Sequence, residues 1–493
     1  MGLGLHGGGV ATAKWLIKHG ATVTATDKRS ADILGPSIKA LQGVRVRYVF
    51  GAHNNDDFRT HDMIIANPAV PAESPYLAIA KKAKKTIVND ASLFFTHSDN
   101  PAIAVTGTRG KTTTTLWIAE LLKKKYPKVR PSGNTPDNAL LKEFDRVQGK
   151  DIPVVAELSS WQLEYLPQVP RAPHVAVITN IYPDHLNRYG GSIERYADAK
   201  AGIFAHQTED DFLILNRDNK WGRYFAAKPH RAQIIWTSTK PLPRSVGNGV
   251  FVCDDHAYLL VDGEEKKIVS ITRFAKERGA HNLANLLAAC AAALFFEPAL
   301  VVTEKDILRL PGPPMRQEVI YRKGRLTVVN DSCATSPDGT IAALRRFFDE
   351  TPPEAKLREG HLPKLSFGGR SRRIILITGG TDKELDPKEL AKEIERTVKK
   401  DDLILLDGSA TKKLASCLKR KELLVLDTLK ECVDAAFVRV WTPRTALKDT
   451  KGRSLERETI ILFSPGAASF EKFLHEFDRG EKFNRLATKG IAK

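Results

Sequence analysis

The segment from Ala102 to Thr115 constrains the fold more than any other part of the chain. It begins with Ala-Ile-Ala-Val-Thr, a short apolar run that is typical of a buried strand. The glycine-bracketed loop Gly107-Thr-Arg-Gly110 follows, and then Lys111 and a run of threonines open a helix. Glycines at both ends of so short a loop allow its backbone to turn tightly and to approach a ligand closely. The order of strand, loop and helix predicts an α/β unit.

The same loop predicts a binding site for ATP. Backbone N–H groups in such a loop point at a phosphate, and the helix N-terminus adds partial positive charge. Lys111 can reach the terminal phosphates, and the hydroxyl of Thr112 or Thr113 can bind Mg²⁺. The usual pattern G-x-x-x-x-G-K-[ST] has a glycine where this chain has Val105. The loop is therefore a shortened variant, which narrows the family to which the chain can belong.

Length and composition place limits on the class of protein. At 493 residues the chain is too long for one core, so two to four domains of roughly 100–200 residues are expected. The longest nearly unbroken apolar run, Ala288 to Phe296, is too short for a bilayer, which needs about 20 apolar residues. The N-terminus lacks the features of a signal peptide, and the five cysteines lack C-x-x-C spacing. We expect a cytoplasmic protein without a membrane partner, disulfide framework or zinc site.

The net charge of +18 has two interpretations. Basic clusters occur at residues 81–85, 123–125, 370–373 and 412–421, each without interleaved aromatic residues. Solvated faces with a general basic bias are the simpler interpretation, and no nucleic-acid module is visible, so no nucleic-acid partner is expected. A nucleotide-regulated nucleic-acid-binding protein is the alternative, and its binding would weaken steeply with salt.

Three consecutive α/β domains are the simplest architecture, with residues 1–90, 91–310 and 311–493 as their ranges. Strands are expected at 22–26, 63–66 and 86–88 in the first; at 152–156, 175–179 and 212–215 in the second, with a hairpin turn at Asp262-Gly263; and at 326–329, 374–378, 403–406, 423–426 and 460–463 in the third. A buried helix is expected to begin near His281, and residues 351–373 and 441–458 have the composition of surface insertions.

The first domain opens with Gly2-Leu-Gly4-Leu-His-Gly7, and Asp27 follows about twenty residues later. This spacing matches a dinucleotide-binding fingerprint, although no strand precedes the glycines in the sequence, which suggests a misassigned start or a truncation. The motif alone is compatible with NAD, and so with a dehydrogenase. A phosphate-bearing uridine nucleotide suits the same glycine turn.

Two further strands of the second domain end in groups that can bind a metal. One ends at Glu157, and the next leads into Thr179-Asn-Ile-Tyr-Pro-Asp184-His185. Ligands bind beyond the carboxyl ends of parallel strands, so neighbouring strands would bring Lys111, Glu157 and His185 to one rim. A carboxylate and an imidazole beside a phosphate are reasonable Mg²⁺ ligands. Taken singly, Glu157 could instead cap a helix and His185 could lie in a surface turn.

Lys200 falls inside an apolar stripe. Ser192 is a plausible N-cap for a helix over 193–205, and Lys200 lies four residues after Tyr196 on its apolar side. The side chain could extend along this surface to solvent. Alternatively it is buried and directed at the active site, where a lowered pKa would leave a neutral amine that reacts with CO₂ to form a metal-binding carbamate.

In the third domain, small or polar loops follow three strands: Asn330-Asp331-Ser-Cys-Ala-Thr335, Gly379-Gly-Thr-Asp-Lys383 and Ser464-Pro-Gly-Ala-Ala-Ser469-Phe470. Each alone is an ordinary turn between a strand and a helix. Their coincidence predicts a substrate rim.

Taken together, these residues resemble the Mur ligase family over nearly the whole chain. The motifs are the shortened loop Gly107 to Thr113, Glu157-Leu-Ser-Ser-Trp-Gln-Leu163, Asp184-His185, Tyr196 to Lys200, His281-Asn-Leu-Ala-Asn285 and Arg316. Ser464 to Phe470 together with Asp478-Arg-Gly480 resembles the branch that adds D-glutamate to UDP-N-acetylmuramoyl-L-alanine, and the Asp-Asn-Pro-Arg of the diaminopimelate-adding branch is absent. Ligases that add another amino acid, and folylpolyglutamate synthases, are the alternatives.

The resemblance implies a monomeric enzyme of peptidoglycan precursor synthesis with a Rossmann-like UDP-binding domain, a P-loop ATPase-like central domain and a Rossmann-like C-terminal domain. ATP would phosphorylate the terminal carboxylate of the substrate, and the amine of D-glutamate would attack the acyl phosphate. The implied site residues are Lys111, His185 and Lys200 for catalysis; Gly107, Thr108, Gly110, Lys111, Thr112, Thr113, Asn285, Arg316 and Asp331 for ATP; Thr112, Glu157, His185 and carbamylated Lys200 for Mg²⁺; Gly4, Asp27, Arg29, Asn67 and Asn134 for the UDP substrate; and Thr335, Lys383, Ser469 and Phe473 for D-glutamate.

The chain departs from the family pattern at two places. Cys333 stands where relatives usually carry lysine, so a cation near the reacting groups is missing or comes from elsewhere. Asn67-Pro-Ala69 replaces the usual Ser-Pro-Gly beside the uridine nucleotide.

Overall fold

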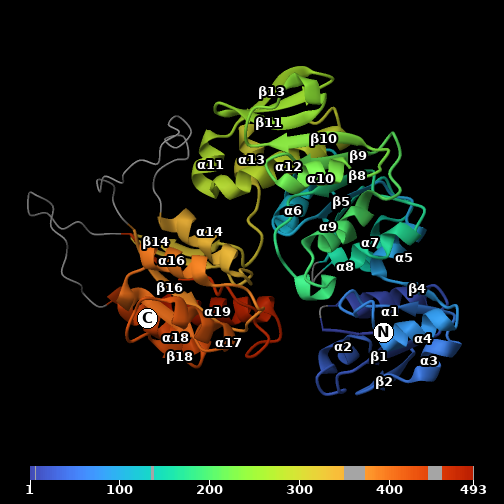
Figure 1. The fold of residues 1–493 in the computed structure, drawn as a ribbon, viewed down its shortest axis with the longest axis horizontal. Helices are drawn as coiled ribbons and strands as arrows, with labels where there is room; N and C mark the ends of the chain where they lie inside the picture. Colours follow the sequence, from blue (N-terminus) through green and yellow to red (C-terminus); the bar gives the residue numbers. More distant parts are fainter. Residues whose placement is uncertain (6, 135–137, 349–371, 442–457, 492–493) are drawn as a thin grey trace, which may run out of the picture. The chain divides into compact units, whose positions relative to one another are not determined.

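The structure, a computed structural model, describes residues 1–5, 7–134, 138–348, 372–441 and 458–491. The chain forms two compact units, residues 1–311 and 312–493 (Figure 1). Most of the two expected insertions, at 351–373 and 441–458, lies outside the described residues. Among the described residues, no helix has the length and apolar character needed to cross a bilayer.

The first part of unit one alternates strands and helices as the sequence predicts. Its elements are α1 (Gly8–Lys18), β1 (Val23–Asp27), α2 (Gly35–Ala40), β2 (Val46–Phe50), α3 (Asn55–Thr60), β3 (Met63–Ile65), α4 (Pro75–Lys82), β4 (Thr86–Val88) and α5 (Asp90–His97). β1 pairs in parallel with β2, and β3 with β4. The segment before the glycines lies between β1 and β3, because Gly2 N donates to Thr26 O (2.7 Å) and Asn67 N to Met1 O (2.9 Å). Met1 and Gly2 therefore link β1 to β3 by hydrogen bonds, although they are not part of a regular strand.

A nine-stranded sheet forms the rest of unit one. Its strands are β5 (Ala102–Thr106), β6 (Pro131–Gly133), β7 (Val154–Glu157), β8 (Val175–Ile178), β9 (Phe212–Asn216), β10 (Gln233–Ser238), β11 (Gly249–Cys253), β12 (His256–Val261) and β13 (Glu264–Ser270), in the order β13-β12-β11-β10-β9-β8-β5-β7-β6. The predicted hairpin at Asp262-Gly263 is confirmed, since β12 and β13 pair antiparallel. β5 lies between β7 and β8 and is parallel to both.

Helices cover both faces of this sheet (Figure 1). They are α6 (Lys111–Leu122), α7 (Leu140–Val147), α8 (Ser160–Leu163), α9 (Ile193–Ala201), α10 (Lys220–Ala226), α11 (Thr272–Arg278), α12 (Ala280–Phe296) and α13 (Glu304–Arg309). Ile103 and Val105 of β5 pack toward α6 and α12, whereas Ala102 and Ala104 belong to the core formed with α5, α7 and α9. The run is apolar throughout because both faces of a parallel strand are buried.

Unit two is built on a six-stranded sheet. Its strands are β14 (Glu318–Lys323), β15 (Leu326–Asn330), β16 (Arg373–Thr378), β17 (Leu403–Leu406), β18 (Val425–Leu426) and β19 (Thr459–Phe463), in the order β14-β15-β19-β16-β17-β18. Its helices are α14 (Pro337–Phe348), α16 (Lys388–Thr397), α17 (Ser409–Cys417), α18 (Leu429–Trp441) and α19 (Glu476–Ile491). β15, β19 and β16 are adjacent and parallel, so the three polar loops that follow them meet at one edge of the sheet.

The helix that carries Lys200 is shorter than the sequence predicts. The Ser192 side chain accepts from Arg195 N, which confirms the predicted N-cap. The α-helix ends at Ala201, and a 3-10 turn, η3 (Gly202–Phe204), follows it. A Cβ at Gly202 would lie 2.5 Å from Leu163 O, so the close packing of this turn against the neighbouring backbone requires glycine.

Candidate active site

The glycine-bracketed loop lies between β5 and α6. Gly107 and Gly110 have φ values of 142° and 82°, a region that favours glycine. Gly110 is the N-cap of α6, so the N–H groups of the first turn face the end of the loop. Lys111 Nζ donates to Thr108 O at 3.2 Å and so lies folded over the loop. The arrangement has the donors and the charge that a phosphate requires.

Thr108 attaches the loop to the strand beside it. Its N–H donates to Asn180 O (2.8 Å), and its Oγ1 accepts from Tyr182 N (3.0 Å) and lies 3.2 Å from Tyr196 Oη. Thr108 is 3 % exposed, so its side chain is committed to the protein interior. A nucleotide would meet its backbone rather than its hydroxyl, and Thr113 is buried in the same way.

Asn285 of α12 packs directly against this loop. A Cβ built on Gly110 would lie 2.1 Å from Asn285 Oδ1, so glycine is required by the approach as well as by φ. Asn282 Oδ1 accepts from Asn285 Nδ2 at 3.2 Å and orients the amide. The structure therefore brings a residue that lies far along the sequence to the phosphate loop.

Glu157 lies at the end of β7, next to β5. It is 3 % exposed, and its Oε2 has no hydrogen-bond partner in the described part of the chain. Asn134 Nδ2 lies 3.5 Å from Oε1, and Asn134 N donates to Glu157 O (2.9 Å). A buried carboxylate oxygen without a donor is costly, and a cation beside it would compensate. This orphaned oxygen fits Mg²⁺.

His185 begins the 3-10 turn η2 (Leu186–Tyr189) after β8 and has a positive φ of 52°. Its Nε2 lies 3.8 Å from Asp184 Oδ1, and the ring packs edge-on against Trp161 at 5.1 Å. Arg109 of the phosphate loop forms an ion pair with Asp184 (3.2 Å). Within the described residues no three His, Cys, Asp or Glu side chains converge as a metal site, so a cation here would need phosphate or water ligands as well.

Lys200 is buried, with 1 % of its surface exposed. Its Nζ donates to Thr106 Oγ1 at 3.4 Å and lies 4.7 Å from the ring centre of Tyr196. Burial, reinforced by the positive charge of Lys111, lowers the pKa of Lys200 well below its usual value, although Asp184 and Glu157 oppose this shift. Of the two sequence interpretations, the structure supports burial beneath the site rather than extension to solvent.

Arg188, which sequence reasoning missed, joins this rim to the first part of the chain. It donates to Pro68 O (2.9 Å), Val70 O (3.2 Å) and Glu164 Oε2 (2.9 Å). Its guanidinium lies 4.7 Å from the Trp161 ring. Arg188 therefore couples the loop after β3 to the turn that begins at His185. Its only sequence signal was its position three residues after the histidine.

Four of the five residues expected at the UDP substrate gather around the glycine turn, whereas the fifth, Asn134, lies beside Glu157. Asp27, 4 % exposed, accepts from Gly4 N (3.1 Å) and from Arg29 N, Nε and Nη2. Burial acts to raise the pKa of Asp27, but the donors from Arg29 and Gly4 outweigh it and hold the pKa below its usual value. Asn67 is the nearest side chain to a Cβ built on Gly4, at 3.5 Å. Gly4, Asp27, Arg29 and Asn67 therefore lie together at the glycine turn.

In unit two, Asp331 anchors the loop after β15. Its Oδ2 accepts from Ser464 Oγ (2.7 Å), and its Oδ1 accepts from Gln317 N (2.9 Å), next to the exposed Arg316. Burial raises the pKa of Asp331 to about 7. Cys333 is buried as well, and burial raises the pKa of its thiol to about 12, so it is neutral at physiological pH.

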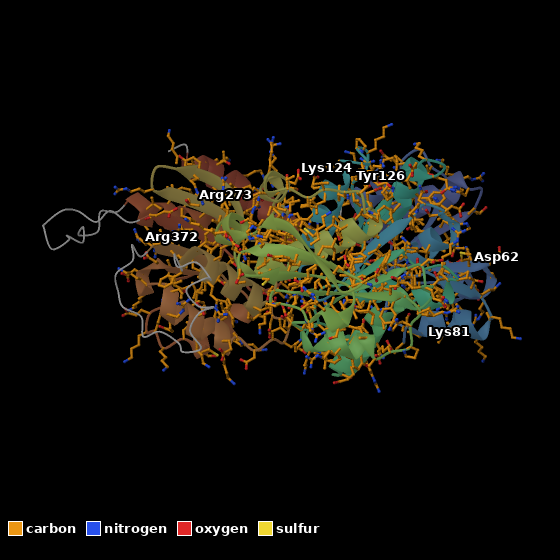
Figure 2. The ribbon with its side chains drawn as sticks, turned by 90° about the horizontal axis from the view of Figure 1, so that it is seen from above. Asp62, Lys81, Lys124, Tyr126, Arg273 and Arg372 are labelled. Atoms are coloured by element: carbon orange, nitrogen blue, oxygen red, sulfur yellow. The ribbon has the colours of Figure 1, made fainter. Side chains whose placement is uncertain are left out.

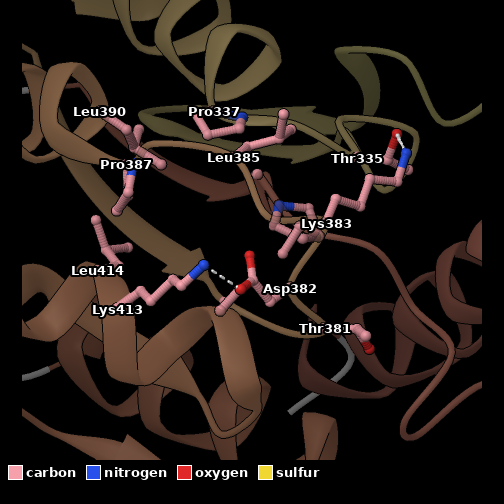
Figure 3. Close-up of a pocket in the computed structure, with 15 residues that line it drawn as sticks. Thr335, Pro337, Thr381, Asp382, Lys383, Leu385, Pro387, Leu390, Lys413 and Leu414 are labelled. Atoms are coloured by element: carbon pink, nitrogen blue, oxygen red, sulfur yellow. Dashed lines mark hydrogen bonds and ion pairs between the residues drawn. The ribbon is translucent and has the colours of Figure 1, made fainter. Parts of the chain in front are cut away.

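The four residues expected at D-glutamate line two pockets rather than one. Thr335 and Lys383 line an open pocket of about 390 Å³, where Lys383 Nζ donates to Thr335 Oγ1 (3.3 Å) and Lys413 pairs with Asp382 (Figure 3). Ser469 and Phe473 line a second, smaller pocket. Thr381, which forms a backbone bridge with Ala468, lines both pockets.

The basic clusters lie on the surface for the most part. Figure 2 labels Lys81 and Lys124, which are both exposed, although Lys124 Nζ also pairs with Asp306 (2.8 Å). Arg420 is different, because its buried side chain donates to Glu395, Ile394 O and Val398 O. Residues 370 and 371 lie outside the described residues.

Comparison with known proteins gives the family. A model described as "Mur ligase MurD-like, N-terminal domain" matches residues 1–89, and the "Mur ligase middle domain" matches residues 105–293. A UDP-N-acetylmuramoylalanine–D-glutamate ligase of Roseiflexus sp. (strain RS-1) is 36 % identical over 99 % of this chain and 97 % of its own length. The chain belongs to the Mur ligase family. A ligase of the same name from Borreliella burgdorferi is 32 % identical over 99 % of this chain and 96 % of its own.

Solved Mur ligases share the fold at lower identity. UDP-N-acetylmuramate-alanine ligase of Thermotoga maritima superposes with a TM-score of 0.57 at 19 % identity, covering 100 % of this chain and 98 % of its own. A second Mur ligase of that organism, solved with ADP, has a TM-score of 0.54 at 16 % identity, covering 90 % and 97 %. The predicted α/β class is confirmed, and as a Mur ligase the chain uses ATP.

Proposed function

We propose that this Mur ligase adds D-glutamate to UDP-N-acetylmuramoyl-L-alanine, with hydrolysis of ATP to ADP and phosphate, in peptidoglycan precursor synthesis. One observation carries the chemistry. The phosphate loop, Glu157 and the turn at His185 follow three adjacent parallel strands, β5, β7 and β8. The full-length likeness to D-glutamate ligases supports the substrates.

The reaction has two balanced steps. A carboxylate oxygen of the substrate's terminal alanine attacks the γ-phosphorus of ATP, and ADP leaves. The amine of D-glutamate then attacks the acyl carbon, phosphate leaves, and the amine nitrogen loses a proton. Both steps bring anions together, so fixed cations have to offset the repulsion. Lys111 and the first turn of α6 provide positive charge at the phosphates, and Gly107, Gly110 and Asn285 shape the space beside them.

We infer that Glu157, His185 and the Thr112 hydroxyl hold Mg²⁺ together with phosphate oxygens. The partnerless buried Oε2 of Glu157 supports this assignment. When bound, Mg²⁺ would neutralise charge on the phosphates and polarise the bond that breaks.

We also propose that Lys200 reacts with CO₂. The amine nitrogen forms a bond to the carbon of CO₂ and loses a proton, which leaves a carbamate anion. The full burial of the side chain and its lowered pKa favour the neutral amine that this step requires. The anion would face the electrostatic influence of Lys111 and serve as a further metal ligand.

The remaining assignments follow the sequence prediction. We propose that Gly4, Asp27, Arg29, Asn67 and Asn134 contact the UDP substrate, that Arg316 and Asp331 contact ATP, and that Thr335, Lys383, Ser469 and Phe473 surround D-glutamate. We further propose three functional domains, 1–90, 91–310 and 311–493, in a cytoplasmic monomer.

The test is phosphate release from ATP in the presence of UDP-N-acetylmuramoyl-L-alanine and a panel of amino acids. Turnover with D-glutamate, and not with L-glutamate, L-lysine or diaminopimelate, is the expected result. Turnover with L-lysine or diaminopimelate in place of D-glutamate would overturn the proposal.

A further inference from the structure

Arg479 of α19 is fully buried, which is unusual for an arginine. All of its hydrogen bonds that the structure describes go to neutral oxygen atoms rather than to a carboxylate. A charged group in this setting is costly to bury, and the negative charges of Glu476 and Asp331 offset only part of that cost. Burial lowers the pKa of Arg479 to about 10, so the guanidinium is still charged at neutral pH.

The guanidinium joins two of the three polar loops. It reaches the loop after β15 through Ser332, where Nε donates to Oγ (3.2 Å) and Nη2 to the carbonyl oxygen (2.7 Å). It reaches the loop after β19 through Nη1, which donates to Ala467 O (3.1 Å) and Ala468 O (2.9 Å). Ser332 Oγ in turn donates to Glu476 O (2.7 Å), so the α19 N-terminus is part of the same network.

The third loop, which follows β16, is connected to this network through Ala468. Ala468 and Thr381 exchange two backbone hydrogen bonds, each of 3.0 Å, and Thr381 lies two residues before Lys383. Ser469 follows Ala468 directly, and Thr335 lies three residues after Ser332. Each of the loops that carry the proposed amino-acid contacts is therefore one or two hydrogen bonds from Arg479.

We propose that Arg479 is a positioning residue for the acidic amino-acid substrate. This inference rests on the proposed function of the loops. The planar guanidinium, with its several N–H donors in fixed directions, holds the loops after β15 and β19 in a single geometry. A lysine at the same place does not reproduce these hydrogen bonds. The charge has a second effect. Cys333, where a lysine is expected, is a neutral buried thiol within the electrostatic reach of Arg479. Arg479 therefore places a positive charge behind the loops that receive a dicarboxylate.

The test compares Arg479→Lys, which keeps the charge but loses the guanidinium hydrogen bonds, with Arg479→Met, which loses both. Arg485→Lys and Arg485→Met are matched controls, because Arg485 is exposed on the same helix. Ser332→Ala removes one acceptor of the Arg479 guanidinium and keeps the arginine. It is the alternative test if Arg479→Met does not fold. The KM for each of the three substrates and kcat are measured by phosphate release, with melting temperature as the check on folding.

The KM for D-glutamate is expected to rise about tenfold in Arg479→Lys, further in Arg479→Met and about threefold in Ser332→Ala, because hydrogen bonds from a charged donor are lost. The KM for ATP and for the UDP substrate should stay within about twofold of the unmodified protein. The KM for D-glutamate of Arg479→Lys, divided by that of the wild-type protein, should rise with pH. The reason is that a buried lysine loses its proton more readily than an arginine.

An unchanged KM for D-glutamate in Arg479→Lys would overturn the inference. So would a parallel change of all three KM values and kcat with a lower melting temperature, which is the signature of a merely structural role. If the unmodified protein turns over another amino acid instead of D-glutamate, the proposed function fails, and the same KM comparison with that amino acid still decides the role of Arg479.

Discussion

Replacing Lys200 by methionine separates what this side chain does for folding from what it does for chemistry. Among the described residues, the amine has one long hydrogen bond, 3.4 Å to Thr106 Oγ1, and it lies 4.7 Å from the centre of the Tyr196 ring. Methionine fills a similar volume and brings no polar group that must be satisfied. Lys200→Met should therefore not lower the free energy of unfolding by more than about 1 kcal/mol.

The pH dependence of stability should reveal the buried amine. Burial lowers the pKa of Lys200 in the folded protein, so the unfolded chain binds more protons at neutral pH, and the contribution of this group to stability rises with pH. A difference of one bound proton is worth about 1.4 kcal/mol per pH unit. As the pH falls from about 10, the wild-type protein, kept in CO₂-free buffer so that Lys200 stays an amine, should lose stability relative to Lys200→Met by up to that amount per pH unit.

Activity, unlike stability, should depend strongly on Lys200. Loss of a charged group beside the reacting phosphates is expected to reduce kcat at least about a hundredfold. In Lys200→Ala, a small carboxylate such as formate or acetate should restore part of the activity by taking the place of the carbamate. Phosphate release and calorimetric melting between pH 7 and 9.5 measure both effects, with the exposed Lys125→Met as control. Retained activity in Lys200→Met, or a destabilisation above about 3 kcal/mol, would refute the reasoning, and failure of every carboxylate would refute the carbamate.

Three further predictions concern other parts of the site. Gly110→Ala should weaken ATP binding at least about tenfold in a nucleotide titration, because the Cβ would lie 2.1 Å from Asn285 Oδ1, whereas Gly149→Ala, also at positive φ but with open space around it, should not. Asp331→Asn should remove a pH dependence of stability: burial raises the pKa of Asp331 to about 7, so the folded state binds the proton more tightly, and up to about 4 kcal/mol of stability is lost as the pH rises from about 4 to 7. Equal slopes for both proteins in calorimetry at several pH values would contradict this. Arg188→Ala should raise the KM for the UDP substrate about tenfold while the KM for ATP stays within about twofold, since only the former depends on the loop after β3.

The sequence was sufficient for the central rim because its signals are local. An apolar run followed by a glycine-bracketed loop predicted β5 and the turn into α6, and the strands that end near Glu157 and His185 are confirmed as its parallel neighbours. The two-pocket arrangement around Lys383 and Ser469 could not be predicted in this way. It depends on a bridge between Thr381 and Ala468, which are far apart in sequence, and pairing at such separation leaves no periodic pattern.

Arg479 is a different case, because the sequence did contain its signal. Lys200 is a cation inside the apolar stripe of a helix. Arg479, Phe483 and Ala487 follow one another at intervals of four residues, and all three are buried on one face of α19. The same criterion, applied to the amino-acid sequence of this helix, marks Arg479 as a buried cation. A cation on a buried helical face costs stability unless it is compensated, so its presence is an argument for a role in binding or catalysis wherever the stripe can be recognised. The KM measurements on Arg479→Lys test that rule as well as the residue.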